Sequence, residues 1–369
     1  MKSTSIRRVV VPGAALLALA ASVTACGASN EGSGSGSSSS SSLSGTLNGG
    51  GSSAQESAMS AWRAGFQSQN GDGVTVNYDP VGSGTGRENF ISGAYMFAGS
   101  DAALSTDAGE LDKAKQRCGG DVIEVPDYVS PIAVVYNLPG VDGLQLSPST
   151  LGDIFSGKVT TWNDPEIAKD NPDAKLPSTA ITPVHRSDDS GTTENFTDYL
   201  SQTGGGTWKY PADDTWPIKG GESGEGTSGL VASVKSGEGT IGYADESQAG
   251  DLGQAAIKVG SSYNKPSAEG AAKVLAMSPL VKGRGANDMA VAVDRTTTEA
   301  GAYPLMLTSY LIACPTYDSK SDADLVKNYL SYIVSKDGQQ AAADQAGSAP
   351  LDPKLQQEAA SIVSKISTK

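Results

Sequence analysis

The sequence predicts an α/β fold, and three observations support this prediction. From Leu43 onward, short β-like runs alternate with segments of helical periodicity, a pattern typical of α/β proteins. Turns rich in glycine and serine connect several of these runs to predicted helices. The chain has 369 residues, enough for two domains at about 100–200 residues each.

The first predicted helix begins near Ser53. Its apolar stripe has helical spacing and consists of Ala58, Ala61, Trp62, Gly65 and Phe66. Ser53 and Glu56 match a capping box, in which the serine hydroxyl accepts a hydrogen bond from the glutamate N–H. After this helix, residues 73–78 alternate apolar and polar side chains, which predicts a half-buried strand.

Further elements follow the same rules. Residues 132–136 and 310–313 are apolar runs and are interpreted as buried strands. An apolar stripe from Leu325 to Ile333 predicts a helix, capped by Ser321 or Asp322. We expect Trp62 and Trp162 to be core residues.

The amino-terminal segment is interpreted as a targeting signal. Lys2, Arg7 and Arg8 precede an apolar run over residues 9–21, which is too short to span a bilayer comfortably. Residues 23–26 resemble a bacterial lipobox, so we expect residues 1–25 to be a signal peptide and Cys26 to be lipidated. An ordinary secretory signal with an incidental Cys26 is the alternative. Residues 27–42 are nearly all Ser and Gly, and with Cys26 they form a predicted flexible tether (26–42).

Composition excludes several classes of protein. The formal charge is −14, which argues against nucleic acid as a partner, because Lys and Arg supply that affinity. His185 is the only histidine, so a His-rich metal site is impossible. The three cysteines contain no C-x-x-C pair, which excludes a zinc ribbon. We expect no metal, no cofactor and no catalytic residue.

Three turns combine small residues with hydroxyl groups just before predicted helices: residues 49–53, 82–86 and 190–193. Such turns expose backbone N–H groups at the positive end of a helix dipole, where oxyanions bind without net positive charge. None of them is a Walker A loop or a dinucleotide fingerprint. Arg186 lies four residues before Ser190, which adds a cation to the third turn.

In their order and spacing these motifs resemble the PstS family, the substrate-binding lipoproteins of bacterial high-affinity phosphate ABC transporters. The resemblance covers nearly all of the chain from Leu43 onward. The strings that carry it are Leu47-Asn-Gly-Gly-Gly-Ser-Ser53, Val76-Asn-Tyr, Gly82-Ser83, Gly99-Ser-Asp101, Leu151-Gly-Asp-Ile-Phe-Ser-Gly-Lys158, Trp162-Asn-Asp-Pro, Arg186-Ser-Asp-Asp-Ser-Gly-Thr192, Trp216-Pro-Ile and Ile241-Gly-Tyr243.

The resemblance implies a two-lobed, Venus-flytrap periplasmic-binding-protein fold with a two-crossing hinge. Lobe I is expected over residues 43–128 plus 302–369, and lobe II over residues 129–301. The hinge crossings are expected around residues 129–133 and 298–304. Dehydrated phosphate would lie in the cleft between the lobes.

The resemblance also implies a set of phosphate-binding residues: Ser53, Ala54, Ser83, Asp101, Arg186, Ser190, Gly191 and Thr192. Asp101 would accept a hydrogen bond from the ligand's P–O–H group. Independently of the resemblance, we expect Asp188 to hold Arg186 by a salt bridge; an acidic residue in an exposed turn is the alternative. Ala54 replaces a residue that is often aromatic in relatives, Asp189 stands where Gly is common, and His185 stands where a second basic residue can occur. The chemistry is consistent, since a desolvated anion needs many donors and an arginine supplies charge-assisted bonds of defined geometry.

Further expectations concern the cysteines and the partners. With Cys26 lipidated, Cys118 and Cys314 remain as an even pair in an exported protein, and the family fold brings both into lobe I, so a disulfide is expected; two buried thiols are the alternative. The expected partners are inorganic phosphate, membrane permease and ATPase subunits of a phosphate ABC transporter, and the membrane itself through the lipid. We expect a monomer on the extracytoplasmic face of the cell membrane.

Two other functions remain open at this stage. One is a secreted phosphatase or serine hydrolase that uses Ser190, although the sequence has no G-x-S-x-G elbow. The other is a surface adhesin, for which phosphate binding would be incidental.

Overall fold

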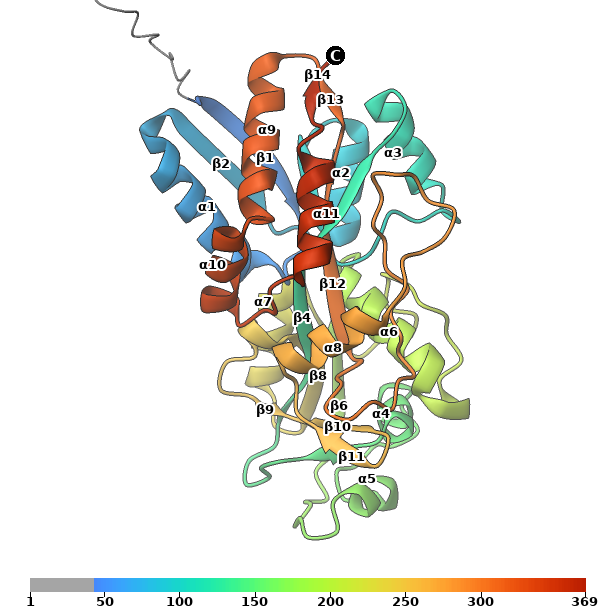
Figure 1. Cartoon of the computed structure of the whole chain (residues 1–369). Helices are drawn as coiled ribbons and strands as arrows, with labels where there is room; N and C mark the ends of the chain where they lie inside the picture. Colours follow the sequence, from blue (N-terminus) through green and yellow to red (C-terminus); the bar gives the residue numbers. More distant parts are fainter. Residues whose placement is uncertain (1–42) are drawn as a thin grey trace, which may run out of the picture. The chain divides into compact units, whose positions relative to one another are not determined.

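The computed structural model describes residues 43–369 (Figure 1). The signal peptide, the lipidated Cys26 and the tether predicted for residues 1–42 lie outside the described residues. Across residues 43–369, no helix combines the length and the apolar character needed to cross a lipid bilayer.

The described chain is a mixed α/β protein, as the sequence predicts. Its α-helices are α1 (Glu56–Asn70), α2 (Ser83–Ser92), α3 (Glu110–Cys118), α4 (Pro148–Phe155), α5 (Pro165–Asp170), α6 (Gly191–Thr203), α7 (Gly226–Ser236), α8 (Ala268–Met277), α9 (Lys320–Ile333), α10 (Lys336–Ala346) and α11 (Pro353–Val363). Short 3₁₀ turns occur at η1 (Gly71–Gly73), η2 (Gly205–Thr207) and η3 (Glu246–Gln248).

One large sheet organises these helices. Its strands follow the order β2 (Val74–Asp79), β1 (Gly45–Gly51), β3 (Phe97–Ser100), β12 (Met306–Ala313), β4 (Ile123–Asn137), β8 (Thr240–Asp245), β6 (Thr182–Arg186) and β7 (Glu222–Gly224), and β9 (Gly253–Gln254) pairs with β4. Two smaller sheets complete the described chain. One has the strand order β11 (Ser262–Asn264), β10 (Ala256–Val259) and β5 (Gln145–Leu146), and the other pairs β13 (Thr316–Tyr317) with β14 (Ser367–Thr368).

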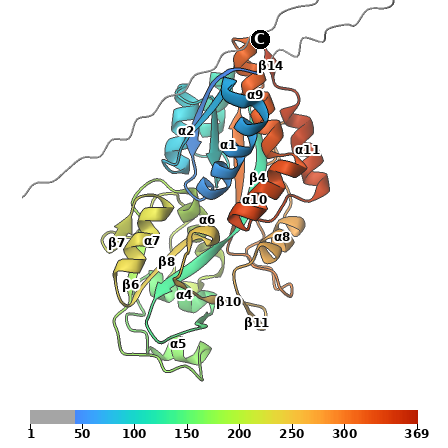
Figure 2. The ribbon, with the colours of Figure 1, turned by 90° about the vertical axis from the view of Figure 1, so that its left-hand side faces the viewer.

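The long strand β4 connects the two ends of the large sheet. Its residues 123–131 pair antiparallel with β12, and its residues 132–137 pair antiparallel with β8. The helices and strands before β4 and after β12 gather at one end of these two strands, and most of those between them lie toward the other end (Figure 1). The loop after α8 returns to the first end, where Met289 donates its N–H to Glu124 O. At the first end, α2 lies on one side of the strands, and α9 and α11 lie on the other (Figure 2).

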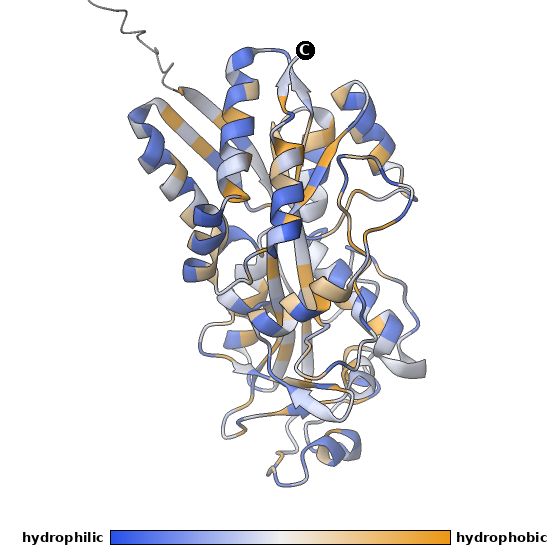
Figure 3. Cartoon of the chain, viewed as in Figure 1, coloured by the Kyte–Doolittle hydropathy of each residue, from blue (hydrophilic) through white to orange (hydrophobic). Residues whose placement is uncertain are grey.

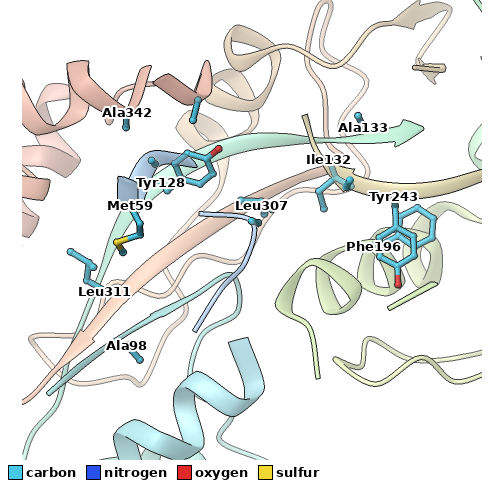
Figure 4. Close-up of a cluster of buried hydrophobic side chains, with 14 of the residues drawn as sticks. Met59, Ala98, Tyr128, Ile132, Ala133, Phe196, Tyr243, Leu307, Leu311 and Ala342 are labelled. Atoms are coloured by element: carbon cyan, nitrogen blue, oxygen red, sulfur yellow. The ribbon is translucent and has the colours of Figure 1, made fainter. Parts of the chain in front are cut away.

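The core follows the sheet. Hydrophobic residues run along the central strands, while the outward faces of α1, α9 and α10 are hydrophilic (Figure 3). The larger of two clusters of buried apolar side chains extends from Met59 and Leu311 to Phe196 and Tyr243 (Figure 4). The rings of Phe196 and Tyr243 stack with centroids 4.2 Å apart. Burial on both faces explains the apolar runs at residues 132–136 of β4 and 310–313 of β12.

The structure confirms most of the predicted elements. The strand expected at residues 73–78 is β2, the first helix is α1, and the runs 132–136 and 310–313 lie within β4 and β12. The stripe from Leu325 to Ile333 lies on α9. Trp62 and Trp162 are fully buried, as expected.

Both predicted helix caps are wrong. The capping residue of α1 is Gln55, which makes no side-chain cap bond; the Ser53 hydroxyl instead contacts Thr227, 174 positions further along the chain. The cap of α9 is Ser319, whose hydroxyl accepts from the Asp322 N–H. For Ser53 the local motif fails because its hydroxyl contacts a residue that is distant in sequence, and a local motif contains no information about such a contact.

The expected disulfide is present. Cys118, the last residue of α3, is bonded to Cys314, which follows β12, and the two Cα atoms are 5.1 Å apart. The bridge ties the carboxyl-terminal part of the chain to α3 across a sequence separation of 196.

Candidate functional site

Four helices, α1, α2, α6 and α7, begin close to one another. Each follows a strand of the large sheet, and β1, β2 and β3 run parallel, as do β6 and β7. The carboxyl ends of parallel strands meet at one edge, so the turns that follow them come together. Two contacts join these turns directly: Gly84 donates its N–H to Asp189 O at 3.0 Å, and Gly226 donates to Asp188 Oδ1 at 3.0 Å. Helix starts carry unpaired N–H groups and a positive dipole end, which favour a bound anion.

Asp101 lies at the centre of this cluster, immediately after β3, and is 3% exposed. Its Oδ1 accepts hydrogen bonds from Ser52 Oγ at 2.5 Å and Ser309 Oγ at 2.7 Å, and its Oδ2 accepts from Thr192 Oγ1 at 3.1 Å. The Asp101 N–H donates to Ser83 Oγ at 3.1 Å. Burial raises the pKa of Asp101, while the three hydroxyls and the charge of Arg186 oppose that rise.

The turn before α1 is held by residues from the other end of the sheet. Thr227, at the start of α7, donates its N–H to Ser53 Oγ at 3.0 Å, and its own hydroxyl lies 3.0 Å from the same oxygen. The Gln248 amide donates to Ser53 O at 2.8 Å. Ala54 is fully buried and donates its N–H to Ser52 Oγ at 3.1 Å.

Arg186 ends β6 and is 3% exposed. Its Nε donates to Asp188 Oδ1 at 2.8 Å, and its Nη2 donates to Asp188 Oδ2, so the predicted salt bridge is present. Burial alone would raise the pKa of Asp188, but hydrogen bonds and the charge from Arg186, with the Gly226 N–H, hold it below its usual value. Asp188 thereby fixes the guanidinium plane and leaves Nη1 without a partner among residues 43–369.

The third predicted turn forms the start of α6. Ser190 is its N-cap and accepts from the Thr193 N–H at 3.2 Å, so its hydroxyl proton can point elsewhere. Gly191 packs so closely that a Cβ there would lie 2.6 Å from Ser83 Oγ and 2.8 Å from Asp101 Cβ. Thr192, next along α6, reaches Asp101 directly.

The structure therefore gathers all eight predicted site residues into one buried cluster. These residues lie at or just after the ends of β1, β2, β3 and β6. Those with a polar side chain are each at most 3% exposed. Sequence analysis missed Ser52, Ser309, Thr227 and Asn195. Asn195 Nδ2 donates to Asp101 O at 2.7 Å. Only Ser52 had a local signal, its place in the predicted first turn; the others lie far from Asp101 in sequence.

Two of the three departures from the family pattern, His185 and Asp189, lie at the edge of the cluster, whereas the third, Ala54, is fully buried within it. His185 stacks on Trp216 with ring centroids 5.3 Å apart, and its two ring nitrogens lie 2.8 Å from Arg186 O and 3.2 Å from Gly220 O. Neither nitrogen contacts Ser190, so the base–nucleophile pair of a serine hydrolase is not formed. Asp189 accepts from the Thr215 hydroxyl at 3.0 Å through its side chain.

The chain is similar in sequence to known proteins of one family. The model of the PBP superfamily domain matches residues 36–337. The chain is 33% identical over 327 residues, 87% of each chain, to the phosphate-binding protein PstS2 of Mycobacterium bovis. It is 36% identical over 296 residues, 78% of each chain, to the phosphate-binding protein PstS 3 of Mycobacterium tuberculosis.

Solved structures share the fold. A high affinity periplasmic phosphate-binding protein, PfluDING, bound with phosphate, matches with a TM-score of 0.71 at 21% identity, over 85% of this chain and 92% of that one. A phosphate-binding protein from Stenotrophomonas maltophilia matches with a TM-score of 0.67 at 19% identity, over 86% and 93% of the two chains. The periplasmic-binding-protein fold expected from the sequence is thus confirmed. The chain belongs to the PstS family of phosphate-binding proteins, within the PBP superfamily.

Proposed function

We propose that this protein is a non-enzymatic receptor that binds inorganic phosphate outside the cell membrane and delivers it to an ABC-type importer. One observation carries the proposal: a buried carboxylate, Asp101, lies among the starts of four helices and beside a buried arginine, Arg186. Helix starts, hydroxyls and Arg186 would donate to phosphate oxygens, and Asp101 would accept from a P–O–H group. Named relatives that bind phosphate support this assignment.

We propose that the ligand groups divide between two lobes, with residues 43–128 plus 302–369 in lobe I and 129–301 in lobe II. The change of partner of β4, from β12 to β8 between Pro131 and Ile132, supports one crossing there. Ser53, Ala54, Ser83 and Asp101 would then face Arg186, Ser190, Gly191 and Thr192 across the cleft. Because both lobes supply donors, phosphate would favour the closed arrangement.

The proposal extends to the setting of the protein. Lipidation of Cys26 and the tether to residue 42 would keep a monomeric receptor at the extracytoplasmic face of the membrane, where it would meet permease and ATPase subunits. Catalysis by Ser190 lacks support, because the only histidine contacts backbone carbonyls instead of the serine hydroxyl.

Equilibrium dialysis of the purified chain against labelled phosphate and labelled sulfate tests the proposal. We expect saturable phosphate binding, weak sulfate binding, and loss of phosphate binding in Arg186→Gln. Arg63→Gln is the matched control, because Arg63 lies on α1 and its Nε donates to Val76 O, away from the cluster. Failure of the wild-type chain to retain phosphate, or turnover of para-nitrophenyl phosphate that Ser190→Ala abolishes, would overturn it.

A further inference from the structure

We propose that Ser52 and Ser309 are specificity-determining residues: by donating to Asp101 Oδ1 they keep this carboxylate an acceptor and so exclude sulfate. The inference rests on the proposed function. Neither serine belongs to the ligand set expected from the family resemblance. Both are fully buried, and both point their hydroxyls at the same carboxylate oxygen.

The direction of the Ser52 hydrogen bond follows from its other contacts. The Ser52 oxygen accepts N–H bonds from Ala54 at 3.1 Å and from Gln55 at 3.4 Å. A hydroxyl has two acceptor lone pairs and one proton. With both lone pairs facing N–H groups, the proton points to Asp101 Oδ1, which lies 2.5 Å away. Oδ1 must therefore be unprotonated.

Ser309 completes the set from the opposite side. It lies on β12, where the register with β4 shifts between Ser309 and Tyr310, so that Asp127 of β4 has no direct partner residue. Bulges of this kind re-aim side chains and are common beside functional sites. Here the Ser309 hydroxyl reaches Asp101 Oδ1 at 2.7 Å, 208 positions away in sequence.

Counting acceptor sites then shows what a ligand meets. An ionised carboxylate offers about four lone-pair directions, two on each oxygen. Ser52 and Ser309 occupy Oδ1, and Thr192 occupies one direction on Oδ2. Oδ2 is left with acceptor capacity for one donor from the ligand. Hydrogen phosphate has a P–O–H group that can donate a hydrogen bond to Oδ2. Sulfate has no proton, so one of its oxygens would face Oδ2 without a hydrogen bond.

The charged surroundings of Asp101 fit this role. Arg186 lies on the side of β6 and favours the ionised form. Asp127, on β4, is 1% exposed, and neither of its carboxylate oxygens has a hydrogen-bond partner among residues 43–369. Burial and the charge of Asp101 both raise the pKa of Asp127 well above its usual value. These surroundings disfavour a charge on Asp127, whereas the three hydroxyls and Arg186 favour the ionised form of Asp101.

The decisive variant is Ser309→Ala, which removes one donor and leaves no buried N–H unpaired. Without this donor the Asp101 pKa rises, so more of the carboxyl is protonated, and a protonated carboxyl can donate to a sulfate oxygen. We expect the ratio of phosphate to sulfate affinity to fall about tenfold near pH 7, the size of one lost hydrogen bond to a charged group. The fall should be larger at pH 6 than at pH 8.

Calorimetric titration of the full chain with inorganic phosphate and with sulfate measures this ratio. The matched control is Thr308→Val, which removes a buried hydroxyl from the neighbouring position of β12; within residues 43–369 this hydroxyl has Met306 Sδ as its side-chain partner. The affinity ratio of this variant should equal that of the wild type. In an Asp101→Asn background, Ser309→Ala should leave the ratio unchanged. If Ser309→Ala does not fold, Ser309→Cys provides the same test, because a thiol is a much weaker donor to Asp101 Oδ1 and fills the same space.

The outcomes separate the two proposals. A wild-type chain that binds neither anion overturns the proposed function and this inference together. A wild-type chain that selects phosphate, with an unchanged ratio and pH profile in Ser309→Ala, overturns the inference alone. An equal loss of affinity for both anions would mean that the serines only support the structure, and would also overturn it.

Discussion

Arg87 Nη2 lies 2.8 Å from Asp214 Oδ2, and this ion pair joins α2 to the loop that follows α6. The same guanidinium donates through Nε to Glu110 at 3.0 Å and is almost fully buried. In the proposed lobes, Arg87 and Glu110 belong to lobe I and Asp214 to lobe II. The Asp214 bond would therefore form only when the lobes close.

Arg87→Gln should weaken phosphate binding by about 1–3 kcal/mol, because it removes this bond and leaves carboxylates facing each other. Calorimetric titration with phosphate measures the loss. Arg117→Gln is the matched control: Arg117 packs 4.1 Å above the Phe90 ring and donates to Tyr95 O, all within the proposed lobe I. Equal affinities in wild type and Arg87→Gln would contradict a role in closure.

Asp101→Asn should relax the exclusion of sulfate. The amide group adds a donor where the ionised carboxylate has only acceptors, so sulfate affinity should rise relative to phosphate by at least ~1–3 kcal/mol. Titration of wild type and variant with both anions checks this change. If the phosphate-to-sulfate ratio is the same in both proteins, Asp101 is only structural and its assignment is withdrawn.

Gly191→Ala should abolish tight phosphate binding while the chain still folds. The added Cβ would lie 2.6 Å from Ser83 Oγ and 2.8 Å from Asp101 Cβ, so the turn before α6 could not approach Asp101 as closely. Gly206→Ala is the control, because a Cβ at that position meets no atom within 4 Å. Circular dichroism shows folding and equilibrium dialysis shows affinity; unimpaired binding in Gly191→Ala would refute the close approach.

Asp245 should make the protein less stable as the pH rises. Burial raises the pKa of Asp245 to about 7, although hydrogen bonds from Ser247 and Tyr128 oppose this. Since the folded state holds this proton more tightly than the unfolded state, the free energy of unfolding falls between about pH 4 and pH 7, by about 1.4 kcal/mol per pH unit at most. Denaturant unfolding of Asp245→Asn at pH 5 and pH 8 should show a smaller fall than in the wild type. An identical fall in both proteins would show that Asp245 does not titrate in this range.

Removal of the disulfide should lower stability without affecting the site. Replacing Cys118 and Cys314 together by serine frees a loop of nearly two hundred residues in the unfolded chain and should cost ~2–4 kcal/mol of unfolding free energy. Denaturant unfolding measures this cost, and phosphate affinity should stay the same. Titration of two free thiols from these positions in the denatured, unreduced protein would show that the bridge does not form.

Much of the fold was predictable because its signals are local. The alternation in β2, the apolar runs in β4 and β12 and the stripes on α1 and α9 each lie within one element, where backbone periodicity alone determines which side chains face the core. The predicted cap of α1 failed for the opposite reason, because a distant contact decided it. The Ser53 hydroxyl had a local partner available, but Thr227 binds it instead.

By itself the sequence determined the α/β class, the hydroxyl-rich turns at the helix starts and, through a family resemblance, the eight residues expected at the site. Only the tertiary structure decided which donors surround Asp101. Ser309 comes from an apolar strand 208 positions away, and Asn195 from the interior of a helix. Neither position belongs to a local sequence pattern. A hydrogen bond between distant segments depends on how the sheet brings the strand ends together in space, and residue spacing along the chain does not determine that arrangement.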